Sequence, residues 1–453
     1  MQDNDKEKFA FINEKIKEKP LKKKRMVICA IFCVILAVVF GLVASLVFTI
    51  AQPKMEEYFY PKQEPVVSIP KDEPTEETEA ETETENTEQS EQDDTQADTE
   101  GLTEDDTEGN TAGDLENGGE IDITNTYGEL SLESFQQLQN QMYDVGREAN
   151  RFIVTVTGVK SDIDWFNNAY ESKGQASGII IADNGEELLI LTERKAIADA
   201  QELFVTFIDD TSAMAEVKKY DGNTGITVLS VPRSEVSEET MNAIKIATLG
   251  NSFQITQGTI VMAVGSPLGT NYSILTGNVT ATDNTISTID ANYKVFTTDI
   301  VGSKDGSGAL INVQGEVIGL VMQDYSSTGE ENTLTAVAIS ELKALIEMLS
   351  NGKDIPYIGL DITTVTSAIV KEYDIPKGAY VKAVEMDSPA MAAGIQSGDV
   401  LTEVDGLAIY TAENYESKLL TLNPEETIKL VISRQGNEGY TEIECEVYVS
   451  VLQ

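Results

Sequence analysis

Residues 178–192, GIIIADNGEELLILT, contain two short apolar runs separated by an Asn-Gly turn. Such runs on either side of Asn-Gly predict two antiparallel strands joined by a tight hairpin. Short strands of the same kind recur in ELFVTFID (202–209), TVLSVP (227–232), GTIVMAVGS (258–266), TGNVTAT (276–282), VFTTDI (295–300) and ALINVQGEVIGLVM (309–322). Regularly spaced short strands with turns between them predict an all-β sandwich or a pair of barrels.

Helical segments flank this strand-rich region. Ser131 is a candidate N-cap for a helix, and SELKALIEMLSNG (340–352) predicts a second helix that closes the domain. Beyond it the order of elements is strand, short helix, strands, a helix over 412–422 and two last strands, which predicts a compact α+β module. We therefore expect a mainly β fold with domains over 130–350 and 351–453.

The charge of the chain is concentrated in one stretch. The 453 residues carry a formal net charge of −45, and residues 72–120 hold 21 Asp and Glu with no Lys or Arg. Such a segment cannot bury enough apolar area to fold, so we expect a disordered acidic linker over 51–129. Because the chain offers no basic groove, nucleic-acid binding is excluded, and neutral or basic peptides are the expected partners.

An uncharged run, MVICAIFCVILAVVFGLVASLVFTI, occupies residues 26–50. It is long enough to span a bilayer as one helix, and the basic cluster KKKR (22–25) before it predicts a cytoplasmic tail over 1–25. The alternative of a cleaved signal peptide is weaker, because the run exceeds the usual length and lacks a small-residue cleavage site. We expect a single-pass anchor in the cell membrane with the C-terminal domains on the extracytoplasmic side.

The chain has three cysteines and no histidine. Cys29 and Cys33 fall inside the apolar run, so Cys445 is the one cysteine beyond it and has no partner for an intramolecular disulfide. A zinc site would need imidazoles or several thiols together. The sequence therefore predicts no metal and no cofactor.

Several segments resemble the HtrA/Deg family of membrane-tethered trypsin-like proteases. The similar segments are ASGIII (176–181), VGSPLG (264–269), TD (298–299), DGSG (305–308), Asn312 and GEVIG (315–319). The resemblance covers about 130–453 and implies two six-stranded antiparallel β-barrels followed by a PDZ domain. It also implies that the chain can form a homo-oligomer.

The positions that would carry catalysis depart from the family. Its mechanism needs an imidazole to take the serine proton and an aspartate to orient that imidazole. Lys195 stands at the place of the histidine and Gly225 at the place of the aspartate. The segment around the nucleophile is one residue shorter than the family pattern, so this position falls on Ser307 or on Gly306. Ser307 is the one plausible nucleophile.

A lysine could in principle replace the histidine. Ser-Lys dyads exist, and burial can lower the pKa of a lysine until it accepts a proton. The acidic chain around Lys195 favours its charged form instead. We predict an inactive protease fold, with an active serine endopeptidase that uses Ser307 and Lys195 as the alternative. The glycines beside Ser307 could still shape backbone N–H groups into an oxyanion-binding nest.

Residues 355–360, IPYIGL, resemble the carboxylate-binding loop of a bacterial PDZ domain. The later segments GAYV (378–381), DSPAMAAGI (387–395), GDVL (398–401) and VDG (404–406) also resemble the PDZ core of the HtrA family. The expected ligand is an extended peptide that adds as a strand between residues 361–363 and the helix over 412–422. The candidate peptide-binding residues are Tyr357, Ile358, Gly359, Leu360, Ile362, Tyr415 and Leu419. Tyr415 and Leu419 could equally belong to the core.

The resemblance implies a pseudoprotease that captures exposed C-termini or extended segments of envelope proteins. It would act as a scaffold, a chaperone or a regulator of active relatives. A third hypothesis is that both domains serve homo-oligomerisation alone.

Overall fold

The computed structural model describes residues 31–32, 34–45, 47, 65–73, 131–163, 169–326 and 332–452. The chain divides into one unit up to Pro65 and a compact second unit from Val66 onward. In the first unit, residues 34–45 are helical and their large apolar side chains are exposed. No helix in the described ranges is both long and apolar enough to cross a membrane. The predicted anchor over 26–50 lies in part outside the described residues, and the basic cluster before it lies wholly outside them.

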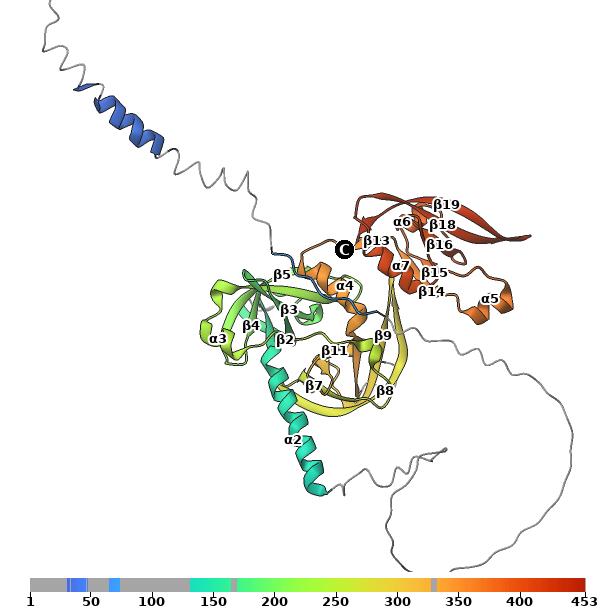
Figure 1. Ribbon diagram of the computed structural model, residues 1–453, viewed down its shortest axis with the longest axis horizontal. Coiled ribbons are helices and arrows are strands. Elements are labelled where there is room, and N and C mark those ends of the chain that lie inside the picture. Colours follow the sequence, from blue (N-terminus) through green and yellow to red (C-terminus); the bar gives the residue numbers. More distant parts are fainter. Residues whose placement is uncertain are drawn as a thin grey trace, which may run out of the picture. The chain divides into compact units, whose positions relative to one another are not determined.

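The predicted helix after the linker is α2 (Leu132–Ala149). The side chain of Ser131 accepts a hydrogen bond from the backbone N–H of Ser134 at 3.1 Å, which confirms the predicted N-cap. The C-terminal end of the helix is anchored, since Gly146 and Ala149 are buried. A 3₁₀ turn (Asn150–Phe152) joins it to the first strand. Figure 1 shows one end of α2 against the barrels.

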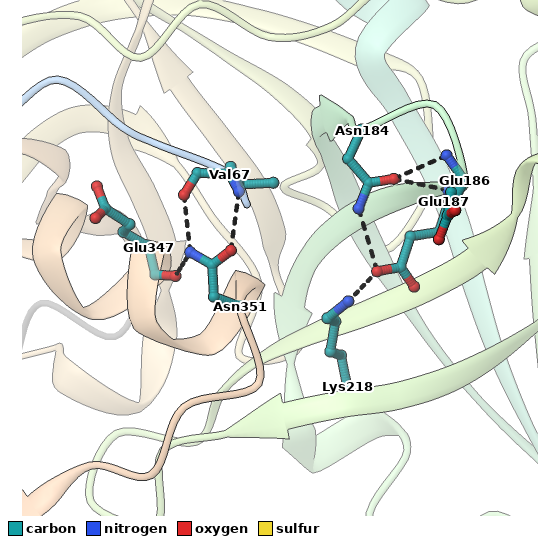
Figure 2. A network of polar contacts seen from close by, with 7 residues as sticks. All are labelled: Val67, Asn184, Glu186, Glu187, Lys218, Glu347 and Asn351. Carbon is teal, nitrogen blue, oxygen red and sulfur yellow. Dashed lines mark hydrogen bonds and ion pairs between the residues drawn. The ribbon is translucent and has the colours of Figure 1, made fainter. Parts of the chain in front are cut away.

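Six strands form the first closed barrel, in the order β1-β2-β3-β6-β5-β4. They are β1 (Ile153–Ile163), β2 (Ala169–Asp183), β3 (Glu187–Glu193), β4 (Glu202–Thr206), β5 (Ser212–Tyr220) and β6 (Ile226–Pro232). The predicted Asn-Gly turn joins β2 to β3. There the side chain of Asn184 accepts hydrogen bonds from the backbone N–H groups of Glu186 and Glu187, as Figure 2 shows. This local bonding fixes the register of the hairpin.

A second closed barrel follows, in the order β10-β11-β12-β9-β8-β7. Its strands are β7 (Ile260–Ser266), β8 (Ser273–Thr288), β9 (Ala291–Val301), β10 (Ser307–Ile311), β11 (Val317–Met322) and β12 (Thr333–Ala338). β10 and β11 are buried along their whole length. The prediction of two six-stranded barrels is confirmed.

Helix α4 (Ile339–Ser350) closes the barrels, as predicted. Residues 66–73, which fall within the expected linker, bind along it. The backbone of Val67 exchanges two hydrogen bonds of 2.8 Å with the side chain of Asn351 (Figure 2). The N–H of Ile69 donates to the carboxylate of Glu347. Val67 and Ile69 pack against the core of the barrels. Residues 66–73 therefore depart from the predicted disordered linker, because their alternating apolar side chains find a partner surface. The rest of the predicted linker, 51–64 and 74–129, lies outside the described residues.

The C-terminal module is the predicted α+β unit. Its main sheet has the order β14-β15-β16-β18-β19, with β17 on β16 and a separate β13–β20 pair. The strands are β13 (Pro356–Tyr357), β14 (Leu360–Thr364), β15 (Ala379–Val384), β16 (Val400–Val404), β17 (Leu407–Ala408), β18 (Thr427–Gly436), β19 (Gly439–Tyr448) and β20 (Ser450–Val451). The helices are α5 (Ser367–Tyr373), α6 (Pro389–Ala392) and α7 (Ala412–Leu419). Strand β14 is an edge strand of the main sheet, and α7 contacts it.

Candidate functional site

Ser307 is the first residue of β10 and lies where the second barrel meets the first. It pairs with Ser266 of β7 and Met322 of β11, and only 2% of its surface is exposed. Its Oγ accepts a hydrogen bond of 2.9 Å from the backbone N–H of Ser177 in β2. The hydroxyl of Ser307 is therefore enclosed between the barrels and does not stand at the rim of an open cleft.

A chain of polar contacts fixes Ser177 in this place. The hydroxyl of Ser177 donates to Asn271 Oδ1 at 2.7 Å, and Asn271 Nδ2 donates to the hydroxyl of Thr155 at 2.5 Å. The hydroxyl of Thr192 donates to the carbonyl of Ser177 at 3.0 Å. Because buried polar groups that lose a partner are costly, this network resists opening around Ser307.

Gly306 forms a tight turn just before Ser307. Its N–H donates to the carbonyl of Ser303 at 2.8 Å, and a Cβ at this position would lie 2.7 Å from the carbonyl oxygen of Pro267. The turn therefore requires glycine. Since the N–H of Gly306 is already used inside the turn, it is not available to the oxyanion-binding nest that the sequence suggested.

Lys195 lies in a 3₁₀ turn (Arg194–Ala196) directly after β3. Its Nζ is 2.9 Å from Oε2 of Glu193 and 3.6 Å from Oδ1 of Asp324. Burial lowers the pKa of Lys195, but the attraction of the two carboxylates outweighs this, so the net shift of the pKa is upward. Across the described residues, no hydrogen bond joins Lys195 to Ser307. The amine is held as an ammonium ion and lacks the contact that a general base needs.

Glu193 is the ion-pair partner of Lys195, which the sequence analysis missed. It is the last residue of β3, and its carboxylate is almost fully buried. Burial raises its pKa to about 7, although Lys195 acts in the opposite direction. Its Oε1 has no hydrogen-bond partner among the described residues. The spacing of Glu193 and Lys195 could have indicated this pair, because side chains two residues apart at the end of a strand lie on the same side.

Gly225 is the residue at which the resemblance implies an aspartate, and it offers backbone contacts alone. Its carbonyl accepts a hydrogen bond from the N–H of Arg194 at 2.7 Å, and its N–H donates to the carbonyl of Asp221. The nearby carboxylate of Asp221 turns to its own loop, where it accepts from Asn223 and Thr224. Burial raises the pKa of Asp221. Among the residues that the structure describes, no carboxylate near Gly225 therefore orients a base toward Ser307.

The predicted carboxylate-binding loop of the C-terminal module does hold a carboxylate. The backbone N–H groups of Ile358 and Gly359 both donate to Oδ2 of Asp290 at 2.7 Å, and that of Leu360 donates to Oδ1 at 2.9 Å. The hydroxyl of Tyr415 donates to Oδ1 at 2.6 Å. Four donors thus converge on one carboxylate, which comes from the turn between β8 and β9 of the second barrel.

Gly359 makes this convergence possible. Its φ of +96° is in a region that side-chain-bearing residues rarely adopt, and a Cβ would lie 2.3 Å from Cβ of Ser388. The loop therefore presents successive N–H groups only because position 359 is glycine, as the sequence predicted.

The other candidate peptide-binding residues have two kinds of surroundings, and Leu419 has both. Ile362, Tyr415 and Leu419 are buried in the core of the C-terminal module, so their side chains pack there whatever else they contact. Tyr357 and Leu419 also line a cavity of about 490 Å³ that reaches Asp290. The structure thus places the predicted loop and the predicted helix around the same cavity, next to Asp290.

Asp290 was not predicted, because nothing in the local sequence shows which distant loop a hairpin turn will reach.

No group of three or more Asp, Glu or Cys side chains in the described ranges could hold a metal ion.

Two family models match the chain. Residues 176–320 match the trypsin-like peptidase domain, and residues 356–445 match the PDZ domain. The serine protease Do-like HtrA of Lactobacillus helveticus is 27% identical over 297 residues, which are 62% of this chain and 70% of that protein. The serine protease Do-like HtrB of Bacillus subtilis is 29% identical over 282 residues, 56% of this chain and 59% of that protein.

A probable periplasmic serine endoprotease of the DegP type from Halomonas elongata is 27% identical over 272 residues, 59% of this chain and 55% of that protein. Among solved structures, the HtrA-type protease AlgW with a decapeptide superimposes with a TM-score of 0.51 at 18% identity, over 68% of this chain and 98% of that chain. At this identity the likeness concerns the fold alone.

Proposed function

Because the chain belongs to the HtrA type of proteins, with a trypsin-like peptidase domain before a PDZ domain, we propose that it is a binding protein without proteolytic activity. Its PDZ domain would bind exposed C-termini or extended segments of envelope proteins. The chain would serve as a scaffold, a chaperone or a regulator of active relatives.

The observation that carries the binding proposal is the set of donors at the loop of Ile358, Gly359 and Leu360. Three successive N–H groups and the hydroxyl of Tyr415 meet on one carboxylate. Hydrogen bonds to an ionised acceptor are about twice as strong as neutral ones, so this geometry selects carboxylates. Strand β14 next to it is an edge strand of the main sheet, and the addition of a strand at such an edge is the usual way an extended peptide binds.

The proposed lack of proteolysis is supported by the chemistry around Ser307. The chain has no imidazole, Lys195 is paired with Glu193, and the hydroxyl of Ser307 is enclosed and accepts from a backbone N–H. Enzymes of this type that lose their triad retain roughly 10³- to 10⁴-fold catalysis over water at best. That residual rate is far below what a working protease requires.

Peptide titration tests the binding proposal. The full-length chain in detergent is titrated with a fluorescein-labelled decapeptide that ends in three valines, once with a free C-terminus and once as the amide. We expect the amide to bind at least about tenfold more weakly, since it cannot supply a charged acceptor. Equal binding of the two peptides, or no binding of either, would count against the proposal.

A serine-directed fluorophosphonate probe tests the competing enzyme hypothesis. We expect no labelling of Ser307 in the wild-type chain, with active trypsin as the positive control. Labelling that disappears in Ser307→Ala would show an activated serine, and it would make Lys195 the first candidate for its base.

The proposed location is the outer side of the cell membrane, with the anchor over 26–50. The support is the uncharged run itself and the basic cluster before it. Ser131 is exposed, so the Ser131→Cys variant can report on topology. A membrane-impermeant maleimide should label this cysteine in intact cells; labelling only after the membrane is broken would reverse the proposed orientation.

Self-association through α2 is a further part of the proposal. Leu132 and Phe135 are 89% and 58% exposed, which is unusual for large apolar side chains on one helix. We expect the chain to have the light-scattering mass of an oligomer and Phe135→Gln to lower it. A monomeric wild-type mass would rule out the hypothesis that both domains serve oligomerisation alone.

A further inference from the structure

We propose that the β8–β9 turn is an internal ligand of the PDZ domain, so that a peptide C-terminus binds only by displacing Asp290. This inference rests on the proposed function, since it assumes that the loop at Gly359 is the peptide site. It adds that the site is occupied by the chain's own barrel until a competing carboxylate arrives.

The carboxylate of Asp290 engages the three successive N–H groups of the loop. Its two oxygens accept from Ile358, Gly359 and Leu360 and from the hydroxyl of Tyr415, at 2.6 to 2.9 Å. Only 6% of Asp290 is exposed. An incoming C-terminal carboxylate therefore cannot join this site and must replace Asp290.

The backbone of the turn also occupies the edge that a peptide strand would use. The N–H of Asp290 donates to the carbonyl of Leu360 at 2.7 Å, and Nδ2 of Asn292 donates to the carbonyl of Ile362 at 3.3 Å. Leu360 and Ile362 are alternate residues of the edge strand β14, whose carbonyls point to the same side. The turn thus reproduces the carboxylate contact and part of the main-chain contact of an added strand.

A third contact ties the turn to α7, on the opposite side of the groove. Oε1 of Glu416 accepts from the backbone N–H of Asn292 at 2.9 Å and from its Nδ2 at 2.7 Å. Asn292 therefore bridges β14 and α7, the two elements between which a peptide is expected to lie. A peptide that enters this groove has to break the contacts of Asn292 as well as those of Asp290.

The geometry of the turn favours such occupancy. Thr288 and Ala291 pair across the hairpin, so Ile289 and Asp290 form a two-residue loop. Asp290 adopts φ +64°, which aspartate tolerates better than most residues. Because the loop is short and its strands belong to the barrel, the carboxylate is presented with little loss of conformational freedom. An internal ligand of this kind lowers the apparent affinity for peptides in proportion to the fraction of open sites.

The variant Asp290→Asn tests the inference. It keeps the size of the side chain but places an amide N–H₂ among N–H donors, which removes the main attraction. Asp283→Asn is the matched control, because Asp283 is an exposed residue of β8 and the change in charge is the same. Both full-length variants are titrated with the free and the amidated decapeptide ending in three valines.

We expect Asp290→Asn to bind the free-carboxylate peptide at least about tenfold more tightly than wild type, and Asp283→Asn to bind it like wild type. If wild type and Asp290→Asn bind it equally and both discriminate against the amide, the inference fails while the proposed function stands. If no form of the protein prefers the free carboxylate, the proposed function fails and the inference fails with it.

Hydrogen exchange of the wild-type chain gives a second test that does not depend on how the variant folds. The N–H groups of Asp290 and Asn292 are bonded only while the turn is docked, whereas those of the loop find a new acceptor in the peptide. Saturating peptide should therefore speed exchange at Asp290 and Asn292 and leave Ile358 and Gly359 protected. Unchanged exchange at Asp290 and Asn292 with peptide bound would overturn the inference.

Discussion

Lys195 and Glu193 form an ion pair of 2.9 Å in which the acid is buried far more deeply than the amine, with side chains that are 5% and 32% exposed. Taking a carboxylate out of water is costly, and the single ammonium beside it compensates this cost only in part. The pKa of Glu193 is accordingly raised to about 7, mainly by burial. The position at which the resemblance to the HtrA/Deg family implies a general base therefore belongs to an ion pair with a buried carboxylate.

The first prediction concerns pH. The pKa of Glu193 in the folded chain, about 7, exceeds its ordinary value of 4.5, so the folded state binds more protons than the unfolded state between these values. The contribution of Glu193 to the free energy of unfolding should therefore fall as pH rises from about 4.5 to 7 and stay level above. The free energy of unfolding of Glu193→Gln, taken relative to that of wild type, should therefore be higher at pH 8 than at pH 5, by up to about 3 kcal/mol. Urea unfolding of both forms at the two pH values measures this, and equal differences at pH 5 and pH 8 would contradict it.

The second prediction concerns an attempt to restore the triad. The double variant Lys195→His, Gly225→Asp supplies the two missing residue types. We expect no Ser307-dependent hydrolysis of an unfolded substrate such as casein, for two reasons. Ser307 is enclosed against Ser177, and position 225 has φ +76°, which strains an aspartate there.

Hydrolysis that is lost again on Ser307→Ala would show that the barrels can open around the serine. It would also show that the residue types at positions 195 and 225 decide whether Ser307 can react.

The third prediction concerns the loop glycine. Gly359→Ala should destabilise the PDZ domain by about 2–3 kcal/mol and abolish carboxylate-dependent peptide binding, because the new Cβ overlaps Ser388 and the φ of +96° is strained. Gly394→Ala is the control, since φ there is +81° but a Cβ would meet nothing within 4 Å. It should cost about 1 kcal/mol and leave binding intact. Equal losses in the two variants would mean that backbone strain alone matters at position 359.

Local signals in the sequence predicted much of this structure. The Asn-Gly turn at 184–185, the cap at Ser131 and the turn conformation of Gly359 each depend on neighbours within a few residues. Because such features are encoded by short-range contacts, their roles can be predicted from the residues alone.

Besides Glu193, two features were not predicted, for different physical reasons. The place of Asp290 in the PDZ loop depends on how the second barrel meets the C-terminal module, and no short-range pattern encodes a contact across about 70 positions. The docking of Val67 and Ile69 could have been found, because they alternate as strand residues do. They were missed because the acidic composition of the residues that follow led us to assign the whole of 51–129 to a disordered linker.

The last prediction concerns this docked segment. Lys343 of α4 is almost fully buried, with a side chain that is 4% exposed, and its Nζ lies 2.7 Å from Oδ2 of Asp72. Asp72 is the one carboxylate paired with Lys343 in the described part of the chain, and it also accepts from the hydroxyl of Ser340 at 2.6 Å. Asp72→Asn would leave a buried ammonium without a counter-charge, so we expect a loss of about 3 kcal/mol of stability.

The double variant Asp72→Asn, Lys343→Met tests whether charge is the cause, because methionine fills similar space without needing a counter-ion. Thermal unfolding should show that the second substitution recovers most of the loss. Limited proteolysis should cut within residues 66–73 of Asp72→Asn sooner than in wild type. If Asp72→Asn is as stable as wild type and is cut no faster, the ion pair does not hold the segment, and the apolar contacts of Val67 and Ile69 with the barrels suffice to keep it in place.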